Sequence, residues 1–251
     1  MQEAFFFGPS GQPIFASYHP PDGGVGDVLT VICPPLFSEY QRTHPALREI
    51  ALMLAQVGQH VLRFDYRGTG DSLGDLEEYS ISDWVDDVAQ TVREGKEISG
   101  CDAVRLLSVR AGALIACKFM GTSSDVQRSV MWDPVAHGTG YLQGLRQAQT
   151  DLCRRNQYLD RHERRAVVGE YAGHVLSARM VEELDALDAN TYARIPTERM
   201  RVVTTSSDYG FPIQGVACEL AAFRCNWDSL ATEMIVPRPV MERLVECLIQ
   251  P

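Results

Sequence analysis

The sequence predicts an α/β fold in which helices cover both faces of a mostly parallel β-sheet. Apolar runs rich in β-branched residues alternate along the chain with amphipathic helical segments. Such alternation is typical of strands that crossover helices bury on both faces. One apolar run, over residues 103–109, leads through a tight turn into a helix that begins at Gly112. With 251 residues, the chain has the length of one large domain, or of one domain with an insertion.

The first predicted strands are short and precede a long apolar run. Residues 3–8 and 14–19 are expected to form an edge hairpin around a Pro-Ser-Gly-Gln turn. Residues 27–33 form a continuous apolar run, as expected of a strand buried on both faces. After a loop, a helix is expected over residues 44–57, with Pro45 in its first turn.

The next strand is expected over residues 60–66, and a glycine-rich loop follows it. Ser80 and Asp83 resemble a capping box, which predicts that a long amphipathic helix starts there. Gly100 is expected to end this helix, since glycine readily adopts the left-handed conformation of a helix C-terminus.

The second half of the chain divides into three parts. Strands are expected over residues 103–109 and 127–135, with a helix over residues 112–120 between them. Residues 138–199 are helical in character, rich in charge and short of β-branched runs, so we expect a helical cap inserted into the core. The core domain is then formed by residues 1–137 and 200–251. The strand and helix alternation resumes, in order, over residues 200–206, 213–223, 231–236 and 239–248.

Composition excludes several classes of function. The net charge of −10 and the pI of about 5.1 argue against nucleic acid as a partner, because nucleic acid requires a basic surface. No apolar run approaches the 18 residues of a membrane span, and the N-terminus lacks the basic region of a signal peptide. The seven cysteines form no CxxC pair, which indicates reduced thiols in a cytoplasmic protein and no metal site.

The loops give no sign of a cofactor. Gly68 and Gly70 lie two residues apart after a predicted strand. A third glycine and a following helix are missing, so the loop is not a dinucleotide-binding fingerprint. The sequence therefore indicates no cofactor.

Several motifs resemble those of the α/β-hydrolase superfamily. The segment FDYRGTGDS, residues 64–72, resembles the strand-loop motif FDxRGxGxS of that fold, and SVRAG, residues 108–112, has the spacing of its nucleophile elbow. The motifs CPP, RFDYRGTGDS, LLSVRAGA and WDPV are similar to those of hydrolase-like proteins associated with bacterial exosortase systems, close to the serine aminopeptidases. The resemblance covers nearly the whole chain and implies the α/β-hydrolase fold.

The nucleophile that the resemblance implies is missing. Serine is expected at the centre of the elbow, where this chain has Arg110. A guanidinium stays protonated and has no lone pair with which to attack a carbonyl. Ser108 lies two residues earlier and is expected to point into the packed side of the turn. Classical serine hydrolysis is therefore not expected.

The other two members of a triad are also in question. Asp208 lies where the family has its acid, and Asp133 is an alternative position in related folds. The histidine should follow the last strand, but the last histidine of the chain is His174. His137 and His44 lie in loops that are candidates to open on the pocket.

The backbone amides of an oxyanion hole do not depend on the missing side chains. The amide of Ala111 and one from Leu36 or Phe37 are expected to point into the pocket at a helix N-terminus, a place that favours negative charge. A buried arginine there needs a carboxylate partner, and Glu39, Asp133 and Asp208 are the candidates.

Two classes of function follow. In the first, the chain binds a small acyl or anionic ligand, with or without an acyl carrier, or keeps a closed internal salt bridge in a site that has lost its activity. Arg110 then either grips the ligand or plugs the site. In the second, it is a hydrolase or acyltransferase for an ester, thioester or amide, in which Glu39 or Asp133 activates a bound water.

Overall fold

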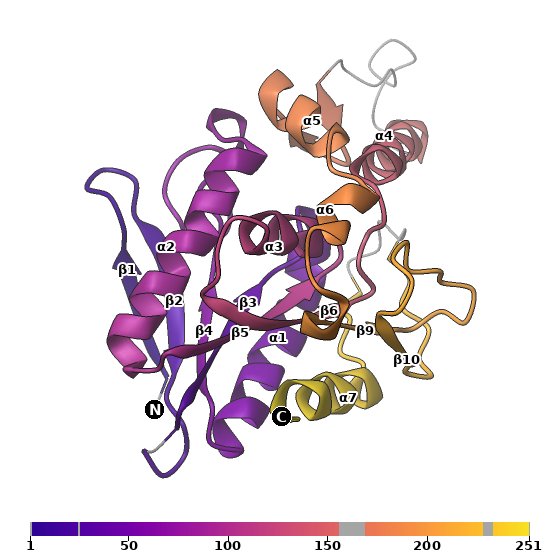
Figure 1. Ribbon diagram of the computed structural model, residues 1–251. Helices are drawn as coiled ribbons and strands as arrows, with labels where there is room; N and C mark the ends of the chain where they lie inside the picture. The colour runs from indigo at the N-terminus through magenta and orange to yellow at the C-terminus, as the bar shows by residue number, and fades with distance from the viewer. Residues whose placement is uncertain (1, 25, 156–168, 228–232, 251) are drawn as a thin grey trace.

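The computed structural model describes all residues except 1, 25, 156–168, 228–232 and 251. At its centre lies an eight-stranded sheet with the order β1-β2-β4-β3-β5-β6-β9-β10 (Figure 1). The strands β1 and β2 form an antiparallel hairpin, β2 also pairs antiparallel with β4, and all further pairs are parallel. The strands are β1 Glu3–Phe7, β2 Ile14–His19, β3 Val28–Cys33, β4 His60–Phe64, β5 Ala103–Val109, β6 Val126–Trp132, β9 Met200–Thr204 and β10 Ala217–Leu220. The predicted mostly parallel sheet is confirmed.

Helices cover both faces of this sheet. On one face α1 (Ser38–Gln56) packs beside α7 (Arg238–Ile249), and on the other α2 (Ile81–Ser99) packs beside α3 (Gly112–Met120). The central strand β5 serves both layers because successive side chains point to opposite faces. Leu106 joins the core under α2 and α3, whereas Leu107 joins the core under α1 and α7. The continuous apolar runs of the sequence are thus explained by burial on two sides.

Several local predictions are confirmed residue by residue. The bounds of β2, β5 and α3 agree with those expected from the sequence. Ser80 caps α2 and forms a capping box with Asp83, and Gly100 ends the helix with φ of 69°. The 3-10 turn η1 (Leu76–Glu78) precedes this cap.

The predicted start of α1 is wrong by six residues. The helix begins at Ser38 rather than at residue 44, so Pro45 lies inside it instead of in its first turn. Proline inside a helix removes one internal hydrogen bond, so a helix start near Pro45 is the simpler expectation. Glu39 and Thr43 are buried in the first two turns, where the Thr43 hydroxyl donates to the Glu39 carbonyl at 2.9 Å, and the earlier start brings Glu39 to the edge of the sheet.

The segment 138–199 adds no strand to the large sheet among its described residues. It contains α4 (Gly138–Arg155), the two-stranded hairpin β7 (Glu170–Tyr171) and β8 (His174–Val175), α5 (Ala178–Asp185), α6 (Ala189–Ala193) and η2 (Thr197–Arg199). The described part of the segment thus contains three α-helices, and its hairpin is a feature that the sequence did not predict. Ala172 and Gly173 both have positive φ, as a two-residue hairpin turn requires.

The last part of the chain departs most from expectation. Over residues 213–223, where a helix was expected, the structure has the short strand β10. The strand expected over residues 231–236 is not formed by residues 233–236, and residues 231–232 lie outside the described part. The C-terminal helix α7 is present where residues 239–248 predicted it.

Two further expectations concern membranes and thiols. Among the described residues, no helix combines the length and apolarity needed to cross a bilayer. All seven cysteines are free thiols; five are buried, Cys225 is half-buried and Cys218 is exposed.

Candidate functional site

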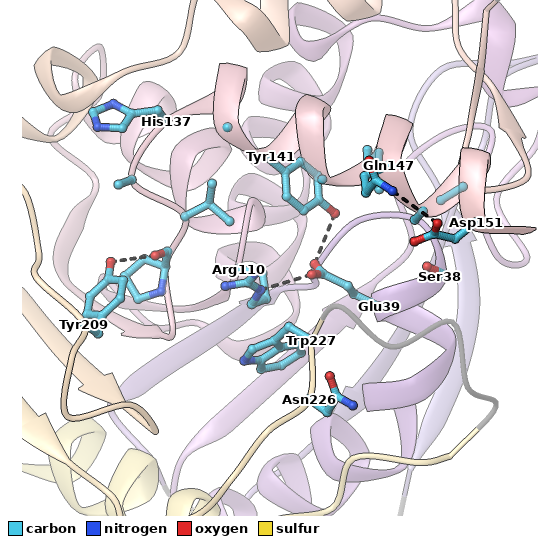
Figure 2. A pocket seen from close by; sticks show the side chains of 18 of the residues that line it. Ser38, Glu39, Arg110, His137, Tyr141, Gln147, Asp151, Tyr209, Asn226 and Trp227 are labelled. Carbon is cyan, nitrogen blue, oxygen red and sulfur yellow. Dashed lines mark hydrogen bonds and ion pairs between the residues drawn. The ribbon is translucent and has the colours of Figure 1, made fainter. Parts of the chain in front are cut away.

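A cavity of about 800 Å³ opens at the edge of the sheet where the parallel strands end. This edge, beyond the carboxyl ends of the strands, is where open α/β sheets bind ligands. The helix α4 lies along one side, and Figure 2 shows side chains from α1, the β5–α3 turn, α4 and the loops after β6, β9 and β10 around the space. Labelled lining residues are Ser38, Glu39, Arg110, His137, Tyr141, Gln147, Asp151, Tyr209, Asn226 and Trp227.

Arg110 occupies the tight turn between β5 and α3. Its backbone lies in the left-handed region, with φ of 53°, as the central residue of a nucleophile elbow does. The turn is fastened on both sides: the amide of Arg110 donates to the carbonyl of Trp132 at 3.0 Å, and its carbonyl accepts from the amide of Val135 at 3.3 Å. The elbow geometry is therefore present, with a guanidinium in the place of a hydroxyl.

The guanidinium of Arg110 is paired with Glu39. Its Nε lies 3.1 Å from Glu39 Oε1, and its Nη1 donates to the backbone carbonyl of Asp133 at 3.1 Å. The indole ring of Trp227 lies 5.0 Å from the guanidinium carbon, within the range of a cation–π contact. The Arg110 side chain is 18% exposed and that of Glu39 is 8% exposed. Of the three candidate carboxylates, Glu39 is the one that pairs with Arg110.

Glu39 has a second partner. The hydroxyl of Tyr141, on α4, donates to Glu39 Oε2 at 3.1 Å. Burial raises the pKa of Glu39, and Arg110 and Tyr141 act in the opposite direction. Burial lowers the pKa of Arg110, but the Glu39 carboxylate outweighs it, so that this pKa lies above its ordinary value. The cavity wall therefore places a guanidinium donor beside a carboxyl acceptor.

Asp133 lies next to this pair but points its carboxylate elsewhere. Its Oδ1 accepts from the amide of Thr205 at 2.7 Å. Its Oδ2 accepts from the Thr205 hydroxyl at 2.6 Å and from the indole N–H of Trp227 at 2.8 Å. Because these three bonds occupy the carboxylate, Asp133 holds Trp227 against Arg110 and reaches Arg110 only through its backbone carbonyl.

Asp208 does not join the site. It is exposed in the loop after β9, where the hydroxyl of Ser207 donates to it, and it is not among the cavity-lining residues. The expectation that Asp208 could approach Arg110 is wrong. The loop turns at Ser206 and presents Tyr209 to the cavity instead, with its hydroxyl bonded to the Pro134 carbonyl at 2.6 Å.

Backbone strain concentrates around the cavity. Outside glycine, the described residues with positive φ are Phe37, Arg110, Asp133 and Ala172. Arg110 and Ala172 line the cavity, and the other two directly precede the lining residues Ser38 and Pro134. Such conformations cost roughly 1–3 kcal/mol each and cluster at active sites and ligand-binding segments.

The remaining predicted site residues divide between two cavities. His137 is exposed and lines the cavity that contains Arg110. Leu36 and Phe37 line a second cavity of about 510 Å³, together with His44 and His174. Phe37 stacks on Tyr141, with ring centroids 6.3 Å apart, so the two cavities lie on either side of this contact.

Two residues of the elbow are buried away from the open space. Ala111 is the N-cap of α3 and is fully buried. Ser108 is also fully buried, and its hydroxyl has no hydrogen-bond partner in the described part of the chain. The expectation that Ser108 points into the packed side of the turn is confirmed. In that same part, no group of three His, Cys, Asp or Glu residues could hold a metal ion.

Sequence reasoning missed the residues that complete the site. Tyr141 and Trp227 come from segments far from the elbow in sequence, and neither carries a motif. One signal was available on α4, where Gly140, Gly144 and Ala148 recur every four residues and all line the cavity. Residues at this spacing lie on one helix face, and small ones leave room beside the helix.

No protein-family model and no curated protein matches the sequence. Solved structures do match. Est1E from Butyrivibrio proteoclasticus with ferulic acid bound is 14% identical, with 98% of each chain covered and a TM-score of 0.66. A hypothetical protein from Pseudomonas aeruginosa is 13% identical over 81% of this chain and 77% of that one, with a TM-score of 0.58.

A thioesterase domain from the curacin biosynthetic pathway is 14% identical over 81% of this chain and 83% of that domain, with a TM-score of 0.52. At such identities the likeness is one of fold alone. Together with the strand order and the helices on both faces of the sheet, it shows that this chain has the α/β-hydrolase fold.

Proposed function

We propose that this protein binds a small acyl or anionic ligand in the cavity around Arg110 and does not carry out classical serine hydrolysis. The observation that carries the proposal is an open cavity of about 800 Å³ whose wall contains the Arg110–Glu39 pair. A side chain that merely plugged a former active site would fill this space. Here the ion pair lies in the wall, and the volume is in the range of small-molecule sites.

The shape of α4 supports a ligand in this space. A methyl group built on Gly140 or Gly144 meets no atom within 4 Å. Glycine inside a helix costs roughly 0.5–1 kcal/mol relative to alanine. The chain therefore tolerates a less stable helix where a larger side chain would enter the cavity.

The residues at the elbow support the proposal that the protein does not carry out classical serine hydrolysis. Arg110 cannot act as a nucleophile, Ser108 is buried, and no histidine follows His174 in the sequence. Acyl transfer through a serine–histidine pair needs both residues within hydrogen-bond reach.

The alternative is an acyl hydrolase or acyltransferase in which Glu39 activates a bound water. One observation favours Glu39 over Asp133 for this role. Glu39 lines the cavity and accepts one side-chain hydrogen bond on each oxygen, whereas Asp133 accepts three. A carboxylate has about four lone-pair sites, so Glu39 can still accept a proton from water.

Three wider proposals concern the setting of this site. The segment 138–199 acts as the cap, since α4 lines the cavity. An acyl-carrier-linked ligand fits a cavity open to solvent at one side. The motif resemblance to exosortase-associated proteins suggests a place in surface-polysaccharide or natural-product assembly in the cytoplasm, and co-purification of an acylated carrier protein from the producing cell tests it.

The test of ligand binding is a thermal-shift panel of carboxylates, phosphates, amides, esters and acyl thioesters. Gly144→Leu fills the cavity from α4 and is expected to abolish every shift. It should not unfold the helix, since leucine is a better helix former than glycine. Gln143→Leu adds the same side chain at the neighbouring exposed position, which does not line the cavity, and is expected to keep the shifts. Shifts that survive Gly144→Leu contradict the proposal.

The test of activity uses a fluorophosphonate probe and a p-nitrophenyl acyl ester. We expect no labelled serine and no burst of p-nitrophenol. Stoichiometric labelling of any serine overturns the interpretation of the elbow. Steady ester cleavage that Glu39→Gln abolishes, without labelling, supports the alternative mechanism.

A further inference from the structure

The Arg110–Glu39 pair differs from an anion-binding arginine because its charge is already balanced. Among the described residues, the charged side chains that line the cavity are two carboxylates, Glu39 and Asp151, and two guanidiniums, Arg110 and Arg155. Their formal charges sum to zero, and the carboxylate of Asp133 lies behind the pair, bonded to Trp227. An anion placed against Arg110 therefore also meets the carboxylate of Glu39.

Both members of the pair retain hydrogen-bonding capacity. Two of the five guanidinium N–H groups of Arg110, on Nε and Nη1, have partners in the described part of the chain. Glu39 uses one acceptor site on each oxygen, for Arg110 and for Tyr141. The wall thus offers spare donors and spare acceptors side by side, and both groups belong to residues that line the cavity.

The pair also lies in the middle of the cavity rather than at its end. In Figure 2, Ser38 and Asp151 lie on one side of it, and Tyr209 and His137 lie on the other. A bound molecule can therefore extend in both directions while its central polar group meets the pair.

We propose that this site selects a neutral carbonyl compound that carries a hydrogen-bond donor next to the carbonyl, of which a carboxamide is the simplest, and that it rejects the corresponding free acid. The carbonyl oxygen accepts from the Arg110 guanidinium, and the N–H donates to the Glu39 carboxylate. The inference rests on the proposed function, because it assigns the ligand class of the same cavity.

Each contact has a physical consequence. A hydrogen bond to a charged group is stronger than one between neutral groups, so an amide gains from both members of the pair. An ester of the same chain offers only an acceptor and leaves Glu39 without the added bond. A carboxylate gains from Arg110 but is repelled by Glu39, since like charges placed side by side disfavour binding.

The test is a matched series with one hydrocarbon chain: hexanamide, methyl hexanoate and hexanoate, measured by calorimetric titration at pH 7.5. We expect the amide to bind about tenfold more tightly than the ester and at least about tenfold more tightly than the carboxylate. Glu39→Gln removes the negative charge while keeping the shape, so we expect hexanoate to become the tightest of the three. Asp151→Asn makes the same chemical change at the far side of the cavity, and the wild-type order should persist.

The outcomes separate this inference from the proposed function. If hexanoate binds the unaltered protein as tightly as the amide or more tightly, the inference is overturned and the proposed binding function stands. If no member binds the unaltered protein, and no acyl thioester or phosphate shifts its melting temperature, both fail. Should Glu39→Gln not fold, the order of the three compounds on the unaltered protein still decides the question.

Discussion

Two buried arginine–carboxylate pairs in this molecule have similar geometry but different surroundings. Arg67 Nε lies 2.5 Å from Asp87 Oδ1, and Arg110 Nε lies 3.1 Å from Glu39 Oε1. Each guanidinium also lies about 5 Å from an aromatic ring, that of Tyr79 at 5.2 Å for Arg67 and that of Trp227 at 5.0 Å for Arg110. The differences lie in what surrounds them.

The Arg67 pair is surrounded by protein groups. Every guanidinium nitrogen of Arg67 donates to a protein oxygen, on Asp87, Gln12 and Asp83. Its backbone amide donates to the second oxygen of Asp87 at 2.9 Å, and the Asp87 side chain is fully buried. This pair fastens the glycine-rich loop to α2, and neither of its residues lines the cavity around Arg110.

The Arg110 pair is incomplete by comparison. Arg110 has a backbone φ of 53°, and both residues of the pair border a cavity. Donors of Arg110 and acceptors of Glu39 that have no partner among the described residues lie beside this open space. Burial of an ion pair therefore does not by itself indicate a structural role. Spare hydrogen-bonding capacity that faces open space separates a recognition group from a structural one.

We expect Arg67→Met to cause the largest loss of unfolding free energy, and Arg110→Met to cause a smaller one. Removing Arg67 leaves a carboxylate with no access to water, and breaking a buried pair costs about 3–5 kcal/mol. Arg110→Met should cost about 1–2 kcal/mol, because water in the cavity can hydrate Glu39. Urea unfolding at pH 7.5 measures both free energies. Equal losses of unfolding free energy in the two variants contradict this difference, because the Arg110 pair then stabilises the fold as much as the Arg67 pair does.

The next effect concerns the rings beneath the two guanidiniums. Trp227→Phe keeps an aromatic face but removes the N–H that Asp133 accepts at 2.8 Å. A bond to a buried charged group contributes about 1.5–3 kcal/mol, so we expect a loss of about 2 kcal/mol. Tyr79→Phe removes only a hydroxyl bonded at 3.3 Å to the Leu73 carbonyl, and should cost less than about 1 kcal/mol.

Unfolding free energies of both phenylalanine variants check this expectation. Binding of hexanamide to Trp227→Phe adds a second readout, since a loosened Trp227 no longer holds Arg110 in place. A loss of stability in Tyr79→Phe as large as in Trp227→Phe contradicts the link from Asp133 through Trp227 to Arg110.

Local sequence patterns predicted those strands and helices whose own residues mark where they begin and end. The strand over residues 103–109 and the helix over residues 112–120 are marked by apolar runs and by a glycine start, and both match the structure. Ser80 and Asp83 predicted a capped helix because a capping box involves only neighbouring residues. The fold followed from the alternation of such segments and from the motif resemblance.

The site could be predicted only in part, because its contacts are made in three dimensions. Position 110 was identified from its motif, and Glu39 was one of three candidates that spacing alone could not separate. Pro45 hid the early start of α1 that brings Glu39 to Arg110. Tyr141 and Trp227 reach the pair from 31 and 117 residues away in sequence (141 − 110 and 227 − 110), and no local pattern records such a meeting.

The smallest expected effect is a difference between the two pairs in how the free energy of unfolding depends on pH. Burial raises the pKa of Asp87 to about 6, above its ordinary value of 3.8, and Arg67 opposes this rise. In Arg67→Met that opposition is gone, so the pKa of Asp87 should rise further. Between the two pKa values the folded state holds a proton that the unfolded chain has released, and stability from this residue therefore increases as pH falls.

On lowering the pH from 7.5 to 5.5, the deficit of Arg67→Met relative to the unaltered protein should narrow by about 1 kcal/mol. The double variant Arg67→Met/Asp87→Asn has no carboxyl at this position and should show no such recovery. Arg110→Met should recover less, although burial also raises the pKa of Glu39, because Glu39 borders the cavity and we expect water there to hydrate its carboxylate. A larger recovery in Arg110→Met than in Arg67→Met contradicts the view that water reaches Glu39, and with it the difference drawn between the two pairs.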